Sequence, residues 1–159
     1  MPVPISADEV FEMACQIERN GAAFYRRAAG QTDDGPARIM LEALADMEDE
    51  HLETFTAMRA EYAARGGSAL QTDGEAAQYL RAMADGRVFD AGDPAGKLTG
   101  DEDLADVLRT AVGLEKDSIV FYAGVKEAVG GAAGKKRIDA IIQQELGHIA
   151  TLNAALAEL

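Results

Sequence analysis

Apolar residues recur along most of the chain at the spacing of an amphipathic helix, and no convincing period-two strand pattern interrupts them. The start and stop signals divide this pattern into segments. Ser6 and Glu9 form a capping box at the first start, and Pro36 suits the first turn of the next helix. The pattern therefore predicts four long helices, at about residues 7–30, 36–65, 101–129 and 133–158.

Residues 66–100 differ from the rest, because they hold seven of the 16 glycines, which marks a connection rather than a long helix. Within them, Thr72–Glu75 would cap a short helix that runs through Ala84, and Thr99–Glu102 is a capping box that would open the third long helix. A connection of this length can travel the length of a bundle and leave the second and third helices parallel. We expect an all-α fold: a single domain, residues 1–159, forming a four-helix bundle with a long crossover between helices 2 and 3.

Composition narrows the class of protein. The 159 residues suit one domain, and 48% of them are hydrophobic, enough for a core. The net charge of −13 argues against a nucleic-acid partner or an anionic membrane, because both are bound through clustered cations. The first residues lack the basic and apolar regions of a signal peptide, and no apolar run is long enough to span a bilayer. We therefore expect a cytoplasmic protein that does not contact a membrane, with Cys15 as buried apolar filler.

The two halves of the chain repeat each other with an offset of 97 residues. Both histidines, His51 and His148, follow a glutamate by three residues. The same offset pairs a lone upstream glutamate and a Phe-Tyr dipeptide in each half. The matched positions are Glu18 with Glu115, Phe24-Tyr25 with Phe121-Tyr122, Glu48 with Glu145, and His51 with His148. One helix–turn–helix unit therefore occurs twice.

The repeat predicts a metal centre. Residues three apart lie on the same side of a helix, so each Glu-x-x-His pair can reach one ion. Glu18 and Glu115 lie on inward-facing apolar stripes, where four carboxylates would repel one another and lose their hydration unless cations neutralise them. Two divalent cations balance the four charges. Oxygen and imidazole donors suit iron or manganese, and zinc less distinctively, while the lack of thiolates argues against a cysteine-based zinc site.

Two glutamates from two helices, with a Glu-x-x-His from each of the others, form the pattern of ferritin-like di-iron carboxylate bundles. In detail, Ile17-Glu18, Phe24-Tyr25 and the run Met47–His51 resemble the ferritin-like domain of the rubrerythrins. The resemblance implies two iron ions, with manganese or zinc as alternatives. One ion would be held by Glu18, Glu48 and His51, and the other by Glu115, Glu145 and His148, with Glu48 and Glu145 as bridges.

The resemblance also implies a function: reaction of the reduced di-iron centre with hydrogen peroxide or dioxygen, as a peroxidase or ferroxidase. Tyr25 and Tyr122 would hydrogen-bond to the ligand carboxylates, or would serve only as packing residues. The chain departs from the family in two ways. It lacks the paired cysteines of an appended rubredoxin domain, so the electron donor would be a separate protein such as a rubredoxin. Ser118 stands where rubrerythrins carry a further carboxylate.

Two other functions fit the same residues. One is iron binding or storage of the ferritin type, in which oxidation serves only deposition. The other is a scaffold whose site holds zinc and carries out no redox chemistry. Long bundles with exposed apolar stripes often pair, so we expect a homodimer.

Overall fold

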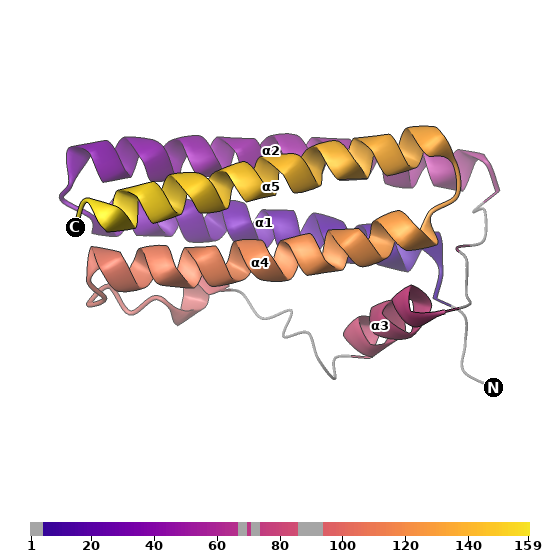
Figure 1. Ribbon diagram of the computed structural model, residues 1–159, viewed down its shortest axis with the longest axis horizontal. Helices are drawn as coiled ribbons and strands as arrows, with labels where there is room; N and C mark the ends of the chain where they lie inside the picture. Colours follow the sequence, from indigo (N-terminus) through magenta and orange to yellow (C-terminus); the bar gives the residue numbers. More distant parts are fainter. Residues whose placement is uncertain (1–4, 67–69, 71–73, 86–93) are drawn as a thin grey trace.

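The computed structural model describes residues 5–66, 70, 74–85 and 94–159. Four long α-helices run side by side along the molecule (Figure 1): α1 (Ala7–Gln31), α2 (Gly35–Ala64), α4 (Leu104–Ala128) and α5 (Ala132–Ala157). Between α2 and α4 in the sequence come a short helix, α3 (Glu75–Ala84), and a 3-10 turn, η1 (Pro94–Lys97). The described residues contain no β-strand, so the all-α prediction is confirmed for them.

The first two helices begin at the capping signals that the sequence contains. The Ser6 hydroxyl accepts a hydrogen bond from the Glu9 amide at 3.1 Å, and the Glu9 carboxylate accepts one from the Ser6 amide at 2.9 Å. At the start of α2 the Asp34 carboxylate accepts from the Ala37 amide at 2.8 Å, and Pro36 lies in the first turn. These bonds satisfy amides that have no partner within the helix.

Helix α4 begins three residues later than the position expected from the Thr99–Glu102 capping box. Its first residue is Leu104, and the Asp103 carboxylate accepts from the Asp106 amide at 2.8 Å. The Glu102 carboxylate instead folds back onto the Thr99 amide at 2.7 Å. The Thr99–Glu102 box therefore stabilises the turn before α4. Asp103, which lies closer to the first helical turn, caps the helix instead.

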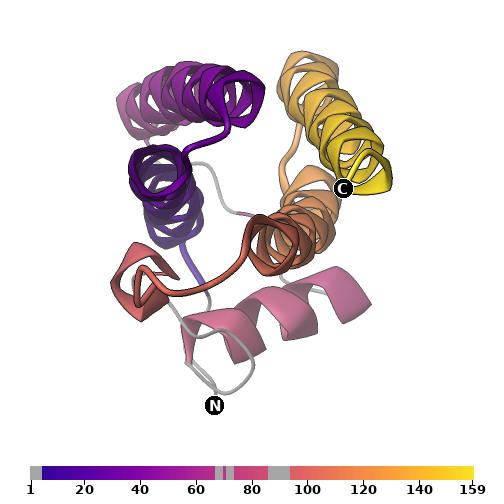
Figure 2. The ribbon, with the colours of Figure 1, turned by 90° about the vertical axis from the view of Figure 1, so that its left-hand side faces the viewer.

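The four long helices occupy the corners of the bundle when it is viewed along its length (Figure 2). Short connections, residues 32–34 and 129–131, make α1 antiparallel to α2 and α4 antiparallel to α5. The chain between α2 and α4 returns along the bundle, so these two helices run in the same direction (Figure 1). The expected cap at Thr72 lies outside the described residues.

Helix α3 and η1 cover the outer side of the α1–α4 pair (Figure 2). Gly124 on α4 allows this contact, because a β-carbon there would lie 3.0 Å from the Tyr79 ring of α3. Each helix in the described residues is too short or too polar to cross a membrane.

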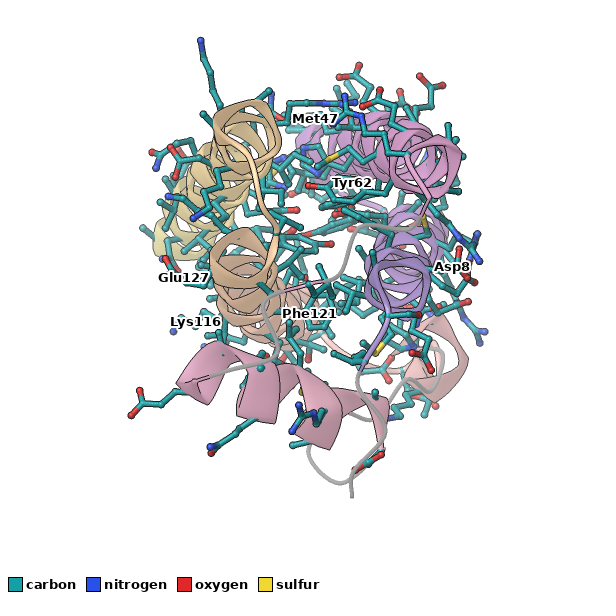
Figure 3. All side chains as sticks on the ribbon, turned by 90° about the vertical axis from the view of Figure 1, so that its right-hand side faces the viewer. Asp8, Met47, Tyr62, Lys116, Phe121 and Glu127 are labelled. Carbon is teal, nitrogen blue, oxygen red and sulfur yellow. The ribbon has the colours of Figure 1, made fainter. Side chains whose placement is uncertain are left out.

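Two apolar clusters fill the bundle, one toward each end. The first is built on large buried side chains that include Phe11, Phe55, Met58, Leu80, Phe121 and Ile138. The second includes Phe24, Leu41, Leu44, Leu108 and Leu152. Figure 3 shows Phe121 turned into the bundle and Asp8 turned away from it. Cys15 is buried in the first cluster, as expected, with its sulfur 3.7 Å from the Thr56 hydroxyl.

Candidate metal centre

The six predicted ligands come together between the two apolar clusters, at the middle of the four long helices. Each is at most 4% exposed: Glu18 from α1, Glu48 and His51 from α2, Glu115 from α4, Glu145 and His148 from α5. Within the described part of the chain, no other acidic, basic or histidine side chain is buried. The structure therefore brings the whole predicted set to one place, and their binding of metal stays a prediction.

His51 lies at the first of two groups of possible metal ligands. Its Nδ1 is 3.1 Å from Glu145 Oε1, 3.6 Å from Glu18 Oε2 and 4.0 Å from Glu48 Oε2. The four side chains thus offer one nitrogen and three carboxylate oxygens, all within 4.8 Å of one another. This separation suits donors that surround one ion.

His148 occupies the matching position in the second group. Its Nδ1 is 3.0 Å from Glu145 Oε2, 3.3 Å from Glu48 Oε1 and 3.4 Å from Glu115 Oε1. Glu48 and Glu145 belong to both groups. A carboxylate can bind one ion with each oxygen, so the shared position of these two residues agrees with the bridging role that the resemblance implies, and that role stays a prediction.

The buried polar atoms of this cluster fit a metal pair. Atoms that face its interior lack a hydrogen-bond partner among the described residues: Glu18 Oε2, Glu48 Oε1, Glu145 Oε1 and Oε2, His51 Nδ1 and His148 Nδ1. Buried polar atoms are nearly always hydrogen-bonded, paired or bound to metal. A set of acidic oxygens and imidazole nitrogens that converge in this way suits two divalent cations with a preference for oxygen and nitrogen.

Glu115 and Glu18 each accept a hydrogen bond from a tyrosine on the neighbouring helix. The Tyr25 hydroxyl on α1 donates to Glu115 Oε1 on α4, and the Tyr122 hydroxyl on α4 donates to Glu18 Oε1 on α1. Both rings are buried. The crossed pair repeats the symmetry of the sequence, and each bond orients one carboxylate. In Glu18 the other oxygen, Oε2, lies 3.6 Å from Nδ1 of His51.

Burial raises the pKa of the two terminal carboxyl groups. It raises the pKa of Glu115 to about 7 against the opposing effect of the His148 imidazole. It also places the pKa of Glu18 well above its usual range, with a further increase from Glu48 nearby. Burial alone would raise the pKa of Glu145, but the nearby imidazoles of His148 and His51 outweigh burial and lower it. The metal-free cluster is thus short of positive charge and retains protons in its place.

The two imidazoles carry part of that missing charge. Burial by itself lowers the pKa of His51, but the nearby carboxylates of Glu145 and Glu18 outweigh burial and raise the value to about 11. Burial likewise lowers the pKa of His148, but the nearby carboxylates of Glu115 and Glu145 outweigh burial and raise the value to about 12. A metal ion would therefore displace protons from both rings.

Sequence reasoning missed one residue in contact with the cluster. Gln144 on α5 places its Oε1 2.5 Å from Nε2 of His51, the ring nitrogen that faces away from the carboxylates. Gln144 directly precedes Glu145 in the sequence. The matching position in the first half of the repeat holds Met47, so the repeat does not single out Gln144.

A cavity of about 400 Å³ between α1 and α4 reaches the cluster at Glu48, Glu115 and Tyr25. Its wall includes apolar side chains from α1 and α4, and residues of α3 and η1 close its outer side. Two small residues at matched repeat positions lie there. Gly21 leaves room for the Glu48 carboxylate, which a β-carbon would approach to 3.3 Å. Ser118 donates its hydroxyl to the Leu114 carbonyl at 3.0 Å.

The rubrerythrin family model matches residues 9–156, a range that contains all six predicted ligands. The chain belongs to the rubrerythrin family. Membership agrees with the resemblance drawn from the repeat. No curated protein matches this rubrerythrin-family chain.

Solved structures share the fold at low sequence identity. A putative ferritin-like diiron-carboxylate protein from Thermotoga maritima is 22% identical, with 99% of each chain covered and a TM-score of 0.72. A hypothetical protein from Pyrococcus furiosus is 21% identical over 96% of this chain and 89% of its own, with a TM-score of 0.70. A manganese catalase from Anabaena is 19% identical over 99% of this chain and 77% of its own, with a TM-score of 0.58. These likenesses show a ferritin-like fold.

Proposed function

We propose that this rubrerythrin-family protein holds two iron ions and reacts with hydrogen peroxide or dioxygen. One observation carries the proposal: six buried donor side chains form two groups that share Glu48 and Glu145, beside a cavity that reaches them. Bound iron would supply the two electrons that, with two protons, reduce one hydrogen peroxide to two waters.

The side chains of this protein perform three tasks in that reaction. They hold the donor atoms in place before metal arrives, so little reorganisation is needed on binding. The hydroxyls of Tyr25 and Tyr122 orient the terminal carboxylates, and burial raises the pKa of both phenols well above the usual range, which keeps them hydrogen-bond donors at neutral pH. The apolar clusters on both sides keep bulk water from the centre.

The α1–α4 cavity supports the choice of a small oxidant. A water molecule in the liquid takes about 30 Å³, and peroxide or dioxygen is of similar scale, so the space beside Glu48 and Glu115 admits either one. The wall of this cavity is largely apolar, which favours small uncharged molecules over ions. We extend the proposal to a cytoplasmic homodimer that receives electrons from a separate protein such as a rubredoxin.

Manganese is the second candidate metal, with catalase activity as the matching function. Carboxylate and imidazole donors suit manganese as well as iron, and one of the structures that share the fold is a manganese catalase. A catalase converts two hydrogen peroxide molecules into two waters and one dioxygen, and it needs no electron donor. Dioxygen release therefore distinguishes the two functions.

The deciding experiment measures metal and reactivity together. Protein purified without added metal is analysed for metal identity and stoichiometry, then given peroxide with and without a reduced rubredoxin. We expect two iron ions per chain and peroxide consumption that requires the donor. Two manganese ions with dioxygen release would favour the catalase. Many irons per chain within a large shell would favour storage, and zinc with no peroxide reaction would exclude redox chemistry.

Substitutions test the assignment of ligands. Glu48→Gln and His148→Ala should each lose stoichiometric two-metal binding, because each removes a donor atom that the centre needs. Glu50→Ala is the matched control, since Glu50 lies on the same helix and is exposed. Retention of both metals by the two ligand variants, with folding verified by circular dichroism, would refute the assignment.

A further inference from the structure

The two histidines differ in their surroundings although they occupy matched positions of the repeat. Each directs Nδ1 toward the carboxylates, at 3.1 Å from Glu145 for His51 and 3.0 Å for His148. Each therefore presents Nε2 on the side away from the centre. The partner of Nε2 fixes the orientation of the ring, and it also determines which nitrogen keeps the proton.

Nε2 of His51 has a partner. Gln144 reaches across from α5 and places its amide oxygen 2.5 Å from this nitrogen. An amide oxygen can only accept, so the Nε2 of His51 carries the proton. A ring held in this way turns the lone pair of its Nδ1 toward the metal position once metal binds.

Nε2 of His148 is buried and has no hydrogen-bond partner among the described residues. The residue that corresponds to Gln144 in the repeat is Met47 on α2, and a thioether is only a weak acceptor. Met47 and His148 line the same groove of about 340 Å³ between α2 and α5, together with Gly147 and Thr151. Figure 3 shows Met47 at that side of the bundle, between the two helices.

We propose that Gln144 is a positioning residue that makes the two metal positions unequal. The position at His51 binds first and more tightly, because its imidazole is already oriented, whereas the ring of His148 must be ordered by the metal itself. Partners of this kind typically change metal affinity about 10- to 100-fold. The inference rests on the proposed metal centre, but it does not depend on the reaction with peroxide.

The experiment uses the fact that the chain contains two histidines. Metal-free protein with ¹⁵N-labelled histidine gives two ring systems in an NMR spectrum, which the His51→Gln variant assigns. Titration with Zn²⁺, a diamagnetic probe, then reports which ring responds to each equivalent, and calorimetry gives the two binding constants. We expect the His51 ring to shift with the first equivalent, the His148 ring with the second, and the two constants to differ at least about ten-fold.

Exchange of the two matched residues provides the sharpest test. Gln144→Met should bring the two binding constants close together by weakening the first. Met47→Gln gives His148 the acceptor that it lacks and should strengthen the second. The double variant, with Met47→Gln and Gln144→Met, should reverse the order of binding. Gln143→Met is the control, because Gln143 is an exposed neighbour on α5 and should leave the order unchanged.

A conservative variant separates hydrogen bonding from packing. Gln144→Glu keeps an acceptor opposite the His51 ring and should preserve the order that Gln144→Met abolishes. Simultaneous shifts of both rings in the wild-type protein would overturn the inference, as would an unchanged order in the double variant. Either result would leave the metal centre intact, whereas failure of the protein to bind two ions would refute the proposed function.

Discussion

The hydroxyl of Tyr25, on helix α1, donates a hydrogen bond to Glu115 on helix α4. Tyr122 on α4 returns the same bond to Glu18 on α1. The two halves of the repeat are therefore joined to each other at the buried cluster. Each half supplies the tyrosine that orients the carboxylate of the other, so the centre depends on the packing of α1 against α4.

Loss of one of these bonds should weaken both the fold and the centre. Tyr25→Phe leaves a buried carboxylate oxygen without its donor, which should cost about 1–3 kcal/mol of unfolding free energy and lower metal affinity about 10- to 100-fold. Denaturant unfolding and metal titration measure the two effects. Tyr62→Phe is the control, because its hydroxyl donates to the Gly130 carbonyl away from the centre. It should reduce stability alone, and equal metal affinity in the two variants would contradict the role of Tyr25.

Metal binding should release protons and strengthen as the pH rises. At pH 7 both imidazoles of the metal-free protein are protonated, since the pKa values of His51 and His148 are about 11 and 12, and Glu115, with a pKa of about 7, is half protonated. Metal must displace these protons, so apparent affinity should increase from pH 6 to pH 8. Calorimetry in buffers of different ionisation enthalpy counts the protons. A binding enthalpy independent of the buffer would rule this out.

The metal-free protein should show the opposite trend in stability. Between pH 6.5 and the folded-state pKa near 11, folded His51 keeps a proton that the unfolded chain loses. His148 does the same. The unfolding free energy should therefore fall as the pH rises through this window, by up to about 1.4 kcal/mol per pH unit for each histidine. Glu115 acts with the same sign between pH 4.5 and 7, because its pKa is raised on folding.

Urea unfolding in the presence of a chelator, from pH 6.5 to 9, tests this dependence. The pKa of Glu145 is lowered on folding, so it contributes the opposite slope, but only as the pH falls from its unfolded value of about 4.5. A double variant with both histidines replaced by glutamine should show a flatter profile. Stability that increases with pH in the metal-free wild type would contradict the charge state assigned to the imidazoles.

Gly21→Ala should disturb the centre without touching a ligand. The added β-carbon would lie 3.3 Å from the Glu48 carboxylate, so this bridging residue must move by a few tenths of an ångström. We expect weaker binding of the metal pair in a titration of the metal-free protein. Gly113→Ala on α4 is the matched control, since nothing lies within 4 Å of its β-carbon. It should leave metal binding unchanged and raise stability by about 0.5–1 kcal/mol through helix propensity.

Filling the α1–α4 cavity should slow the reaction of the loaded protein while leaving its metal content unchanged. Ser118→Phe places a ring in the space that leads to Glu115, so the rate constant for peroxide consumption should fall. Ser118→Ala removes only a hydroxyl that bonds within its own helix and serves as the control. An unchanged rate in the phenylalanine variant, with two metals bound, would show that the oxidant enters by another route.

The sequence by itself determined the helical class of the fold, the capping of α1, the position of Pro36 in the first turn of α2, and the six candidate ligands. It could do so because these features depend on local spacing: a helix places residues three apart on one side, and the repeat shows the same spacing twice. The later start of α4 was also a local matter, but Thr99–Glu102 and Asp103 are competing signals, and their relative strength depends on the geometry of the preceding turn.

Only the tertiary structure decided which side chains meet across the bundle. The crossed bonds of Tyr25 and Tyr122, the contact of Gln144 with His51, and the cavity beside Gly21 and Ser118 join residues from different helices. Spacing within one helix says nothing of which neighbour a side chain will face, because that depends on how the helices are rotated and placed against one another. The repeat also gave no sign that the two histidines have different partners at Nε2. That difference arises at Met47 and Gln144, where the two halves of the sequence do not match.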